Sequence, residues 1–260
     1  MGIRLSVLAS GSKGNSIYLA TERVQLLVDA GLSAREIERR LLSISVSPKD
    51  LSGIVVTHEH VDHVRSIGAL SRRYKLPVYL NKRTYLQLPS AVGRLPEKEE
   101  FVAGRSFIIG DITLHPFSVS HDAADPVGFT LVNGSVKIGL CTDLGAATRL
   151  VHRHLEHCSA LVLEANYDLE MLKNGPYPWP VKQRIKSRLG HLSNQQSGEV
   201  LKQVFNEGLQ ELILAHMSET NNSYEMLLKT FSSILDHPMR EHLNITLASQ
   251  HDPIDLVDIS

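Results

Sequence analysis

The chain has 260 residues, of which 42% are apolar and 21% are charged, and its formal net charge is −1. This length suffices for a substantial core, and we expect one α/β domain spanning residues 1–260. The near-neutral balance gives no global electrostatic reason for binding nucleic acid or membranes, so such binding would need a local patch. Two cysteines exclude a disulfide scaffold and a cysteine-based zinc module. Without an apolar run long enough for a signal peptide or a membrane span, we expect a cytoplasmic protein that binds no membrane.

The first eighty residues alternate between short apolar runs and a helical pattern. Ser33 is placed to cap a helix whose apolar positions Ile37, Leu41 and Leu42 recur at helical spacing. A second helix is predicted over 64–74, and a glycine-rich turn over 10–15. The predicted strands of this half are 3–9, 17–19, 25–28, 54–56 and 77–80.

The middle of the chain is rich in strands, and the last hundred residues alternate between strands and helices again. Asn133-Gly134 is a strong signal for a two-residue hairpin turn. Two successive batches of strands and helices predict two sheets packed face to face, with helices outside both. The predicted strands of this half are 105–109, 112–117, 127–132, 136–141, 160–163, 212–214 and 245–247.

The segment 58–63 places three histidines and an aspartate within six residues, directly after the strand 54–56. Side chains alternate along an extended backbone, so His58 and His60 can project the same way, and Asp62 and His63 can follow from the next helix. Imidazole and carboxylate are ligands that divalent zinc, manganese and iron accept. The motif holds more ligands than one ion needs and predicts half of a two-metal hydrolytic site.

Further ligand-type residues follow other apolar runs. His121 comes after 112–120, Asp143 after 138–141 and His216 after 212–214. Strand ends are where α/β architectures place functional groups. Each position alone is weak evidence, but three of them in this order are able to complete the metal cage.

The ordered set of these residues resembles the metallo-β-lactamase superfamily over essentially the whole chain. Finer features over 8–16, 190–194 and 216–222 resemble its YycJ/WalJ branch, which is associated with DNA exonuclease activity. The resemblance implies the αβ/βα four-layer sandwich of that superfamily, two mixed β-sheets packed face to face with helices outside. The residues that carry the superfamily match are Asp29, His58, His60, Asp62, His63, His121, Asp143 and His216.

Carried over to this chain, the resemblance implies two divalent metal ions. His58, His60 and His121 would hold the first ion. Asp62, His63 and His216 would hold the second, with Asp143 bridging both. Asp29 would orient a ligand histidine rather than bind metal. A carboxylate at position 143, where true β-lactamases carry a cysteine, points to phosphoester chemistry and leaves zinc, manganese and iron open.

Two adjacent metal ions can activate a hydroxide and clamp the oxygens of a phosphodiester. Asp62 is placed to orient that hydroxide. His191 is our candidate for donating a proton to the leaving oxygen, a role that rests on the resemblance to phosphodiesterase members. Ser193 and Gln196 form a capping-box pattern, which predicts a helix beginning beside His191, and helix N-termini attract phosphate.

A basic run precedes His191 and includes Lys182, Arg184 and Lys186. On a helix, 182 pairs with 186 and 184 with 188, and the two basic rows could follow a nucleic-acid backbone. Trp179 or Tyr177 could stack on a base. The glycine-rich turn could add backbone N–H groups as a phosphate cradle. Lys13, Asn15 and Ser193 complete the predicted substrate contacts, although a charged run is often only a solvated face.

The sequence therefore predicts a dinuclear metal-dependent phosphodiesterase, with DNA as the expected substrate and an exonuclease as the expected type. The main alternative is hydrolysis of a small carboxylic ester, thioester or lactone at the same dimetal site, which would leave His191 and the basic run dispensable. A purely structural metal module would need a closed ligand set. The sequence leaves the oligomeric state, the strand polarity and the choice of metal open.

Overall fold

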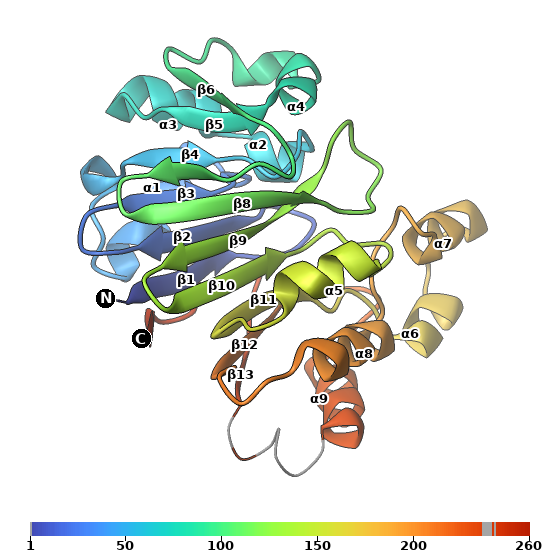
Figure 1. Cartoon of the computed structure of the whole chain (residues 1–260). Coiled ribbons are helices and arrows are strands. Elements are labelled where there is room, and N and C mark those ends of the chain that lie inside the picture. Colours follow the sequence, from blue (N-terminus) through green and yellow to red (C-terminus); the bar gives the residue numbers. More distant parts are fainter. Residues whose placement is uncertain (1, 236–240, 242) are drawn as a thin grey trace.

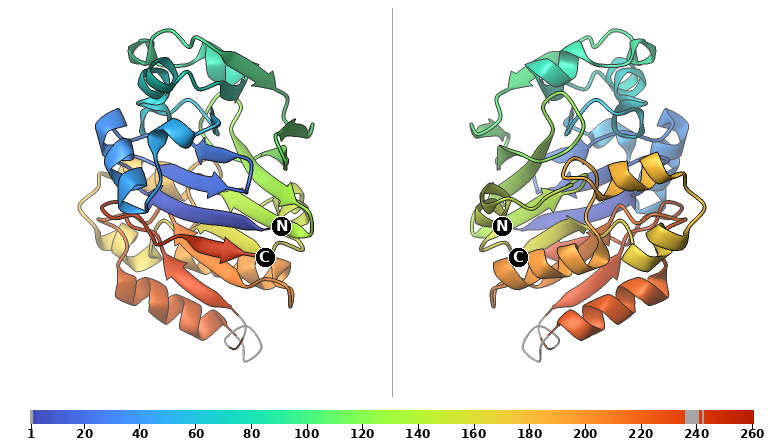
Figure 2. Two further views of the ribbon diagram at one scale, coloured as in Figure 1. Left: turned by 90° about the vertical axis from the view of Figure 1, so that its left-hand side faces the viewer. Right: turned by 90° about the vertical axis from the view of Figure 1, so that its right-hand side faces the viewer.

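The computed structural model describes residues 2–235, 241 and 243–260. Two seven-stranded sheets pack face to face, and helices cover both outer surfaces (Figure 1). This arrangement confirms the predicted four-layer α/β sandwich with mixed sheets. The two ends of the described chain lie side by side at one end of the sandwich (Figure 2), because β14 (Val257–Ile259) pairs with β1 (Ile3–Ala9).

The first sheet has the order β14-β1-β2-β3-β4-β5-β6. Strands β1 to β3 pair antiparallel, whereas β3 to β6 pair parallel. Its remaining strands are β2 (Ser16–Ala20), β3 (Gln25–Val28), β4 (Gly53–Val55), β5 (Val78–Asn81) and β6 (Lys98–Phe101).

The second sheet has the order β13-β12-β11-β10-β9-β8-β7. Strands β7 to β10 form an antiparallel meander, and β10 to β13 pair parallel. Its strands are β7 (Phe107–Ile109), β8 (Ile112–Ser118), β9 (Val127–Asn133), β10 (Val136–Cys141), β11 (Ala160–Glu164), β12 (Glu211–Ala215) and β13 (Asn244–Leu247).

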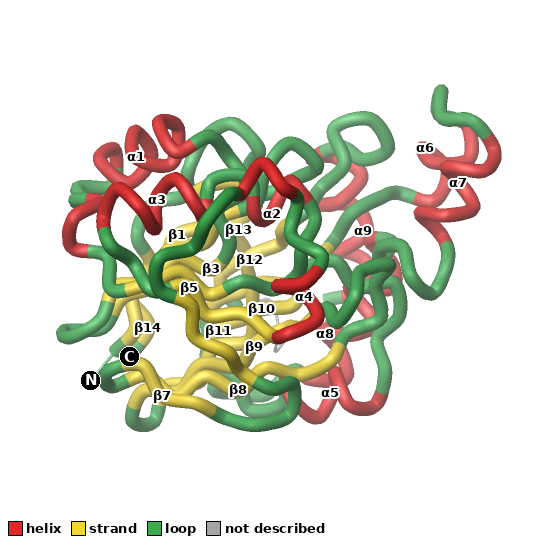
Figure 3. The backbone as a smooth tube through the Cα atoms, turned by 90° about the horizontal axis from the view of Figure 1, so that it is seen from above, coloured by secondary structure: helices red, strands yellow, loops and turns green. Residues whose placement is uncertain are grey.

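Helices flank the first sheet on its outer face and the second sheet on the opposite face (Figure 3). Beside the first sheet lie α1 (Ala34–Ser43), α2 (Val61–Val64), α3 (Ile67–Tyr74), α4 (Lys82–Leu86) and the short 3-10 turns η1 (Pro48–Asp50) and η2 (Ser90–Val92). Beside the second lie α5 (Arg149–Leu155), α8 (Asn194–Val204) and α9 (Tyr224–Ile234), whereas α6 (Leu169–Asn174) and α7 (Trp179–Lys186) project beyond the sheets.

The central core lies between the two sheets. Alternating residues of β1, including Leu5 and Val7, point inward and meet Leu114 and Phe129 from the second sheet. The intervening residues of the strands point outward and pack under the helices, which gives each sheet a second apolar layer. Both faces of the parallel strands are therefore buried, which explains why these strands read as continuous apolar runs.

Three local predictions differ from the structure. Leu42 is 61% exposed, and the buried face of α1 instead includes Arg40, whose Nη1 donates to the carbonyl oxygen of Leu8. The helix predicted over 64–74 is broken, because the N–H of Ser66 donates to Ala30 O rather than continuing a helical ladder. The hairpin turn sits one residue later than predicted, since Asn133 pairs with Val136.

The carboxyl ends of the parallel strands β3, β4, β10, β11 and β12 meet at one edge of the sandwich. Helices α6 and α7 project at the end of the molecule opposite the two termini (Figures 1 and 3). Within the described ranges, no helix is long and apolar enough to cross a membrane.

Candidate metal centre

Three of the predicted site residues stand one or two positions beyond strand ends, in the left-handed backbone region. The φ angles are 62° at Asp29 after β3, 55° at Asp143 after β10 and 57° at His216 after β12. This conformation is unfavourable for residues other than glycine, and such positions concentrate at functional sites. The strained backbone turns each side chain back towards the edge shared by the two sheets.

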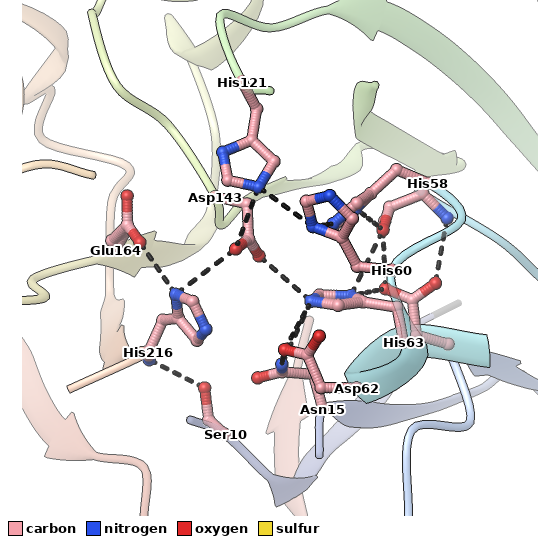
Figure 4. A network of polar contacts seen from close by, with 12 residues as sticks. Ser10, Asn15, His58, His60, Asp62, His63, His121, Asp143, Glu164 and His216 are labelled. Carbon is pink, nitrogen blue, oxygen red and sulfur yellow. Dashed lines mark hydrogen bonds and ion pairs between the residues drawn. The ribbon is translucent and has the colours of Figure 1, made fainter. Parts of the chain in front are cut away.

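The first predicted triad converges on one point (Figure 4). His58 Nε2 lies 3.1 Å from His60 Nδ1, which lies 3.3 Å from His121 Nε2. His58 is buried beyond the end of β4, and His121 is buried in the loop after β8. Three ring nitrogens at this separation form a ligand set that a divalent metal ion fits.

The second predicted triad lies beside the first. Asp62, His63 and His216 form a group whose ligand atoms lie within 4.8 Å of one another. Asp143 stands between the triads, with Oδ2 3.2 Å from His63 Nε2 and Oδ1 3.7 Å from His121 Nε2. The carboxylate of Asp143 thus has one oxygen near each triad, as the predicted bridging role requires.

Hydrogen bonds behind the imidazoles fix which nitrogen faces the centre. His63 Nδ1 donates to Asp29 Oδ2 at 2.8 Å, and His121 Nδ1 donates to the carbonyl oxygen of Gly190 at 3.2 Å. Thr57 Oγ1 donates to Asp29, so it accepts from His58 Nδ1 at 3.0 Å. Nε2 of each of these histidines therefore faces the centre and is the nitrogen that would bind a metal ion.

The two triads differ in charge. Burial lowers the pKa of His58 well below its usual range, so this imidazole is neutral. Burial also opposes protonation of His63, but Asp143 and Asp29 outweigh it and raise the pKa well above the usual range. Burial would raise the pKa of Asp143, yet His216 and His63 hold it well below. The buried carboxylate of Asp143, which stands between the triads, therefore needs positive charge nearby.

Two orphaned atoms support a metal ion at this place. Among the described residues, Asp143 Oδ2 and His216 Nε2 are buried and form no hydrogen bond, although Asp143 Oδ2 lies 3.2 Å from His63 Nε2. Leaving such atoms unpaired in a protein interior is costly unless another group satisfies them. A divalent cation bound by these ligands would satisfy both atoms and compensate the buried carboxylates.

Glu164 is a site residue that the sequence analysis missed. It is fully buried at the end of β11, and its Oε1 accepts from Nδ1 of both His191 and His216, each at 2.8 Å. The backbone N–H groups of Leu144 and Leu192 donate to its other oxygen. The signal was available, because Glu164 directly follows the apolar run 160–163, as His216 follows 212–214.

His191 lies at the edge of the centre. Burial lowers its pKa, but the charge and hydrogen bond of Glu164 outweigh this and raise it to about 9. The imidazole is therefore protonated at neutral pH, with Nδ1 used by Glu164. The capping box of Ser193 and Gln196 is present, which confirms the helix start predicted beside His191.

A pocket of about 220 Å³ opens over the centre. His60, Asp62, Asp143 and His191 contribute to its floor and walls, and α7 forms part of its rim through Val181, Arg184 and Ile185. Arg184 Nη2 pairs with Asp122 Oδ2 at 2.5 Å, which links α7 to the loop that carries His121.

Arg184 is the only predicted substrate contact that lines this pocket. Lys182 Nζ donates to the carbonyl oxygens of Lys173 and Gly175, and Ser193 Oγ caps α8. Because α7 ends at Lys186, the predicted row from 184 to 188 does not lie on one helix. The basic run is thus mostly engaged elsewhere or solvated.

Most N–H groups of the glycine-rich turn are already hydrogen-bonded and are therefore not free to bind a phosphate. Gly11 N donates to Asn15 Oδ1 and Lys13 N to Gln250 Oε1, whereas Ser12 lines the pocket. Lys13 Nζ pairs with Glu219 at 2.5 Å. Asn15 is buried and contacts Asp62, so it lies behind the ligands rather than towards a substrate.

Comparisons with known proteins agree with this geometry. A family model described as a beta-lactamase superfamily domain matches residues 25–217. The chain is 39% identical over 238 residues to the exodeoxyribonuclease YycJ of Bacillus anthracis, covering 91% of this chain and 90% of the relative. It is 38% identical over 230 residues to the exodeoxyribonuclease WalJ of Streptococcus pneumoniae serotype 2, covering 87% and 86%.

A solved structure with the same fold is the metallo-beta-lactamase fold protein YhfI from Bacillus subtilis. It matches with a TM-score of 0.76 over 98% of this chain and 99% of that chain. The sequence identity is only 16%, so this likeness concerns the fold alone.

We expect Gly31→Ala to disrupt the second triad. A Cβ at this position would lie 1.6 Å from the carbonyl oxygen of Asp62 and 2.7 Å from Asn15 N, so the turn that carries Asp62 and His63 must move. Metal content measured by elemental analysis should fall, together with the melting temperature. Gly104→Ala is the control, since its Cβ would meet nothing within 4 Å and only its φ of +81° opposes alanine. Unchanged metal content in Gly31→Ala would contradict this reading.

Proposed function

The chain belongs to the metallo-β-lactamase superfamily, and on that premise we propose that it is a DNA exonuclease that uses two divalent metal ions. The observation that carries the proposal is the pair of convergent ligand triads, joined at Asp143, under an open pocket. The relatives at 38–39% identity, which are named exodeoxyribonucleases, support DNA as the substrate. We expect the enzyme to act on DNA in the cytoplasm.

Seven side chains would hold the two metal ions. His58, His60 and His121 would hold one ion, Asp62, His63 and His216 the other, and Asp143 would bridge them. Bound there, the ions supply a nucleophilic hydroxide at neutral pH and offset charge on the phosphate. Three imidazoles in one triad, and a carboxylate with two imidazoles in the other beside Asp143, suit zinc or manganese, with iron also compatible.

Asp62 would orient the nucleophile. Its carboxylate lines the pocket, and Asn15 Nδ2 holds Oδ2 at 3.1 Å. The carboxylate can accept a hydrogen bond from the attacking group and so direct it at the phosphorus atom.

His191 would donate a proton to the leaving oxygen. It lines the pocket, and Glu164 both fixes its orientation and keeps it protonated at neutral pH. Proton transfer from a positioned histidine typically contributes about 10²–10⁴-fold to the rate.

The competing ester, thioester or lactone hydrolase would not need a protonated histidine at this place or a cation at the pocket rim. The structure supplies both His191 and Arg184 there. The named relatives also favour the nuclease.

The direct test is digestion of end-labelled DNA and RNA, single- and double-stranded, by protein reconstituted separately with manganese and zinc. We expect progressive shortening of DNA, and Asp62→Ala should abolish it without unfolding the protein. Polynucleotides that stay intact beside a fully loaded dimetal centre would turn the assignment to a small ester or phosphodiester.

We expect His191→Ala to lower the rate on DNA by about 10²–10⁴-fold, because the leaving alkoxide loses its proton donor. A substrate with nitrophenolate as leaving group needs little protonation and should lose much less. The fall of wild-type activity as pH rises, where His191 loses its proton, should be absent from the variant. An equal loss on both substrates would point to a binding role.

Arg184→Ala should weaken DNA binding and reduce its salt dependence, since the guanidinium lies at the pocket rim. Lys186→Ala removes the same charge from the same helix but does not line the pocket, so it is the matched control. Binding is measured by titration of labelled DNA at several salt concentrations. Equal losses in the two variants would assign the effect to the overall charge of α7.

A further inference from the structure

We propose that two buried asparagines, Asn166 and Asn15, are positioning residues for one of the two metal sites only, the site of Asp62, His63 and His216. The inference rests on the proposed dimetal centre and adds that its two metal sites depend on different supporting residues. Removing either amide should lower the affinity of this site for its metal ion and leave the affinity of the other site unchanged. Asn166 has no role in the proposed mechanism, and Asn15 enters it only as a hydrogen-bond partner of Asp62.

Asn166 holds the backbone of His216. It lies two residues beyond the end of β11 and is 9% exposed, and its Nδ2 donates to the carbonyl oxygen of His216 at 2.7 Å. His216 has a φ of 57°, which is unfavourable for histidine and therefore needs fixed partners. Ser10 Oγ accepts from the N–H of the same residue at 2.7 Å. The side-chain amide of Asn166 thus completes a clamp on both backbone polar groups of His216.

Asn166 also links the loop of His191 to the loop of His216, the two loops whose imidazoles both bond Glu164. Its backbone N–H donates to Leu192 O at 3.0 Å, and its backbone oxygen accepts from Ser218 N at 2.8 Å. A buried amide pair of Asn194 and Asn222 ties the same loops together, with bonds of 2.9 and 2.8 Å. Because the backbone bonds of Asn166 survive truncation of its side chain, Asn166→Ala removes only the contact to His216.

Asn15 performs the equivalent task for Asp62. Its side chain is fixed by a two-way contact with Gly11, because Oδ1 accepts from Gly11 N at 2.8 Å and Nδ2 donates to Gly11 O at 3.0 Å. The same Nδ2 lies 3.1 Å from Asp62 Oδ2 and 3.0 Å from His63 Nε2. The backbone N–H of Asn15 donates to Asp62 O at 2.7 Å. The backbone of the glycine-rich turn therefore fixes the position of this side-chain amide.

The first triad is held differently. His58 is oriented by Thr57 and His121 by the carbonyl oxygen of Gly190. In the part of the chain that the structure describes, no asparagine side chain donates to His58, His60 or His121. Loss of a buried amide should therefore leave the first triad in place.

The test is stepwise metal binding to full-length, metal-free protein, measured by calorimetric titration with Mn²⁺ and repeated with Zn²⁺. The variants are Asn166→Ala and Asn15→Ala. Asn133→Ala is the matched control, because Asn133 is 3% exposed and its Nδ2 likewise donates to a backbone oxygen, that of Asp111, in the β9–β10 hairpin away from the centre. We expect two equivalents in the wild type and in the control.

In both site variants one of the two equivalents should bind about 10–100-fold more weakly than in the wild type, the usual scale for partners behind metal ligands, while the affinity for the other is unchanged. Excess metal should then restore nuclease activity, which loss of folding alone would not allow. Wild-type affinity for the second ion, or equal weakening of both ions, overturns the inference. If Asn166→Ala does not fold, the same titration of Asn15→Ala tests the inference. A wild type that binds one equivalent overturns the dimetal centre itself.

Discussion

The structure depends on the burial of three carboxylates, Asp29, Asp143 and Glu164, at one edge of a sandwich of apolar sheets. Buried charges are tolerated when they are paired and hydrogen-bonded. Asp29 and Glu164 each accept hydrogen bonds from imidazoles and backbone N–H groups, whereas Asp143 keeps one oxygen without a hydrogen bond. The pairing of these carboxylates fixes the tautomers of the surrounding histidines and so defines the metal centre.

The fold makes this arrangement possible because parallel strands from both sheets end at the same edge. Strand ends free the backbone from sheet pairing, so Asp29, Asp143 and His216 can adopt the left-handed conformation there. The cost of that conformation is offset by the surrounding hydrogen bonds, including the clamp on His216 by Ser10 and Asn166. Rigid sheets below and hydrogen-bonded loops above preorganise the ligands, as a hydrolytic site requires.

The two triads are chemically unequal, and this bears on the proposed reaction. One consists of histidines in which burial keeps His58 neutral, and the other adds Asp62 to two histidines beside Asp143. Glu164 connects the second triad to His191, so the proposed proton donor and a metal ligand share one carboxylate. Changes at Glu164 should consequently affect metal binding and proton transfer together, whereas His191 can be altered with less effect on the ligands.

The sequence by itself determined the two-sheet architecture, most strands along the chain and the position of the ligand-type residues, because apolar periodicity and strand-end polar residues are local signals. It missed β6 and β14, the two short strands at the edges of the first sheet. It did not reveal Glu164, Asn166 or the use of Asn15, since a carboxylate or amide gains its role only from partners far away in sequence, such as His191 and His216 for Glu164. Nor did the sequence indicate that the Lys182 ammonium group bonds the carbonyl oxygens at the end of α6, a long-range contact that only the tertiary structure decides. Local pattern specifies which elements form, whereas long-range packing decides which polar atoms remain available for chemistry.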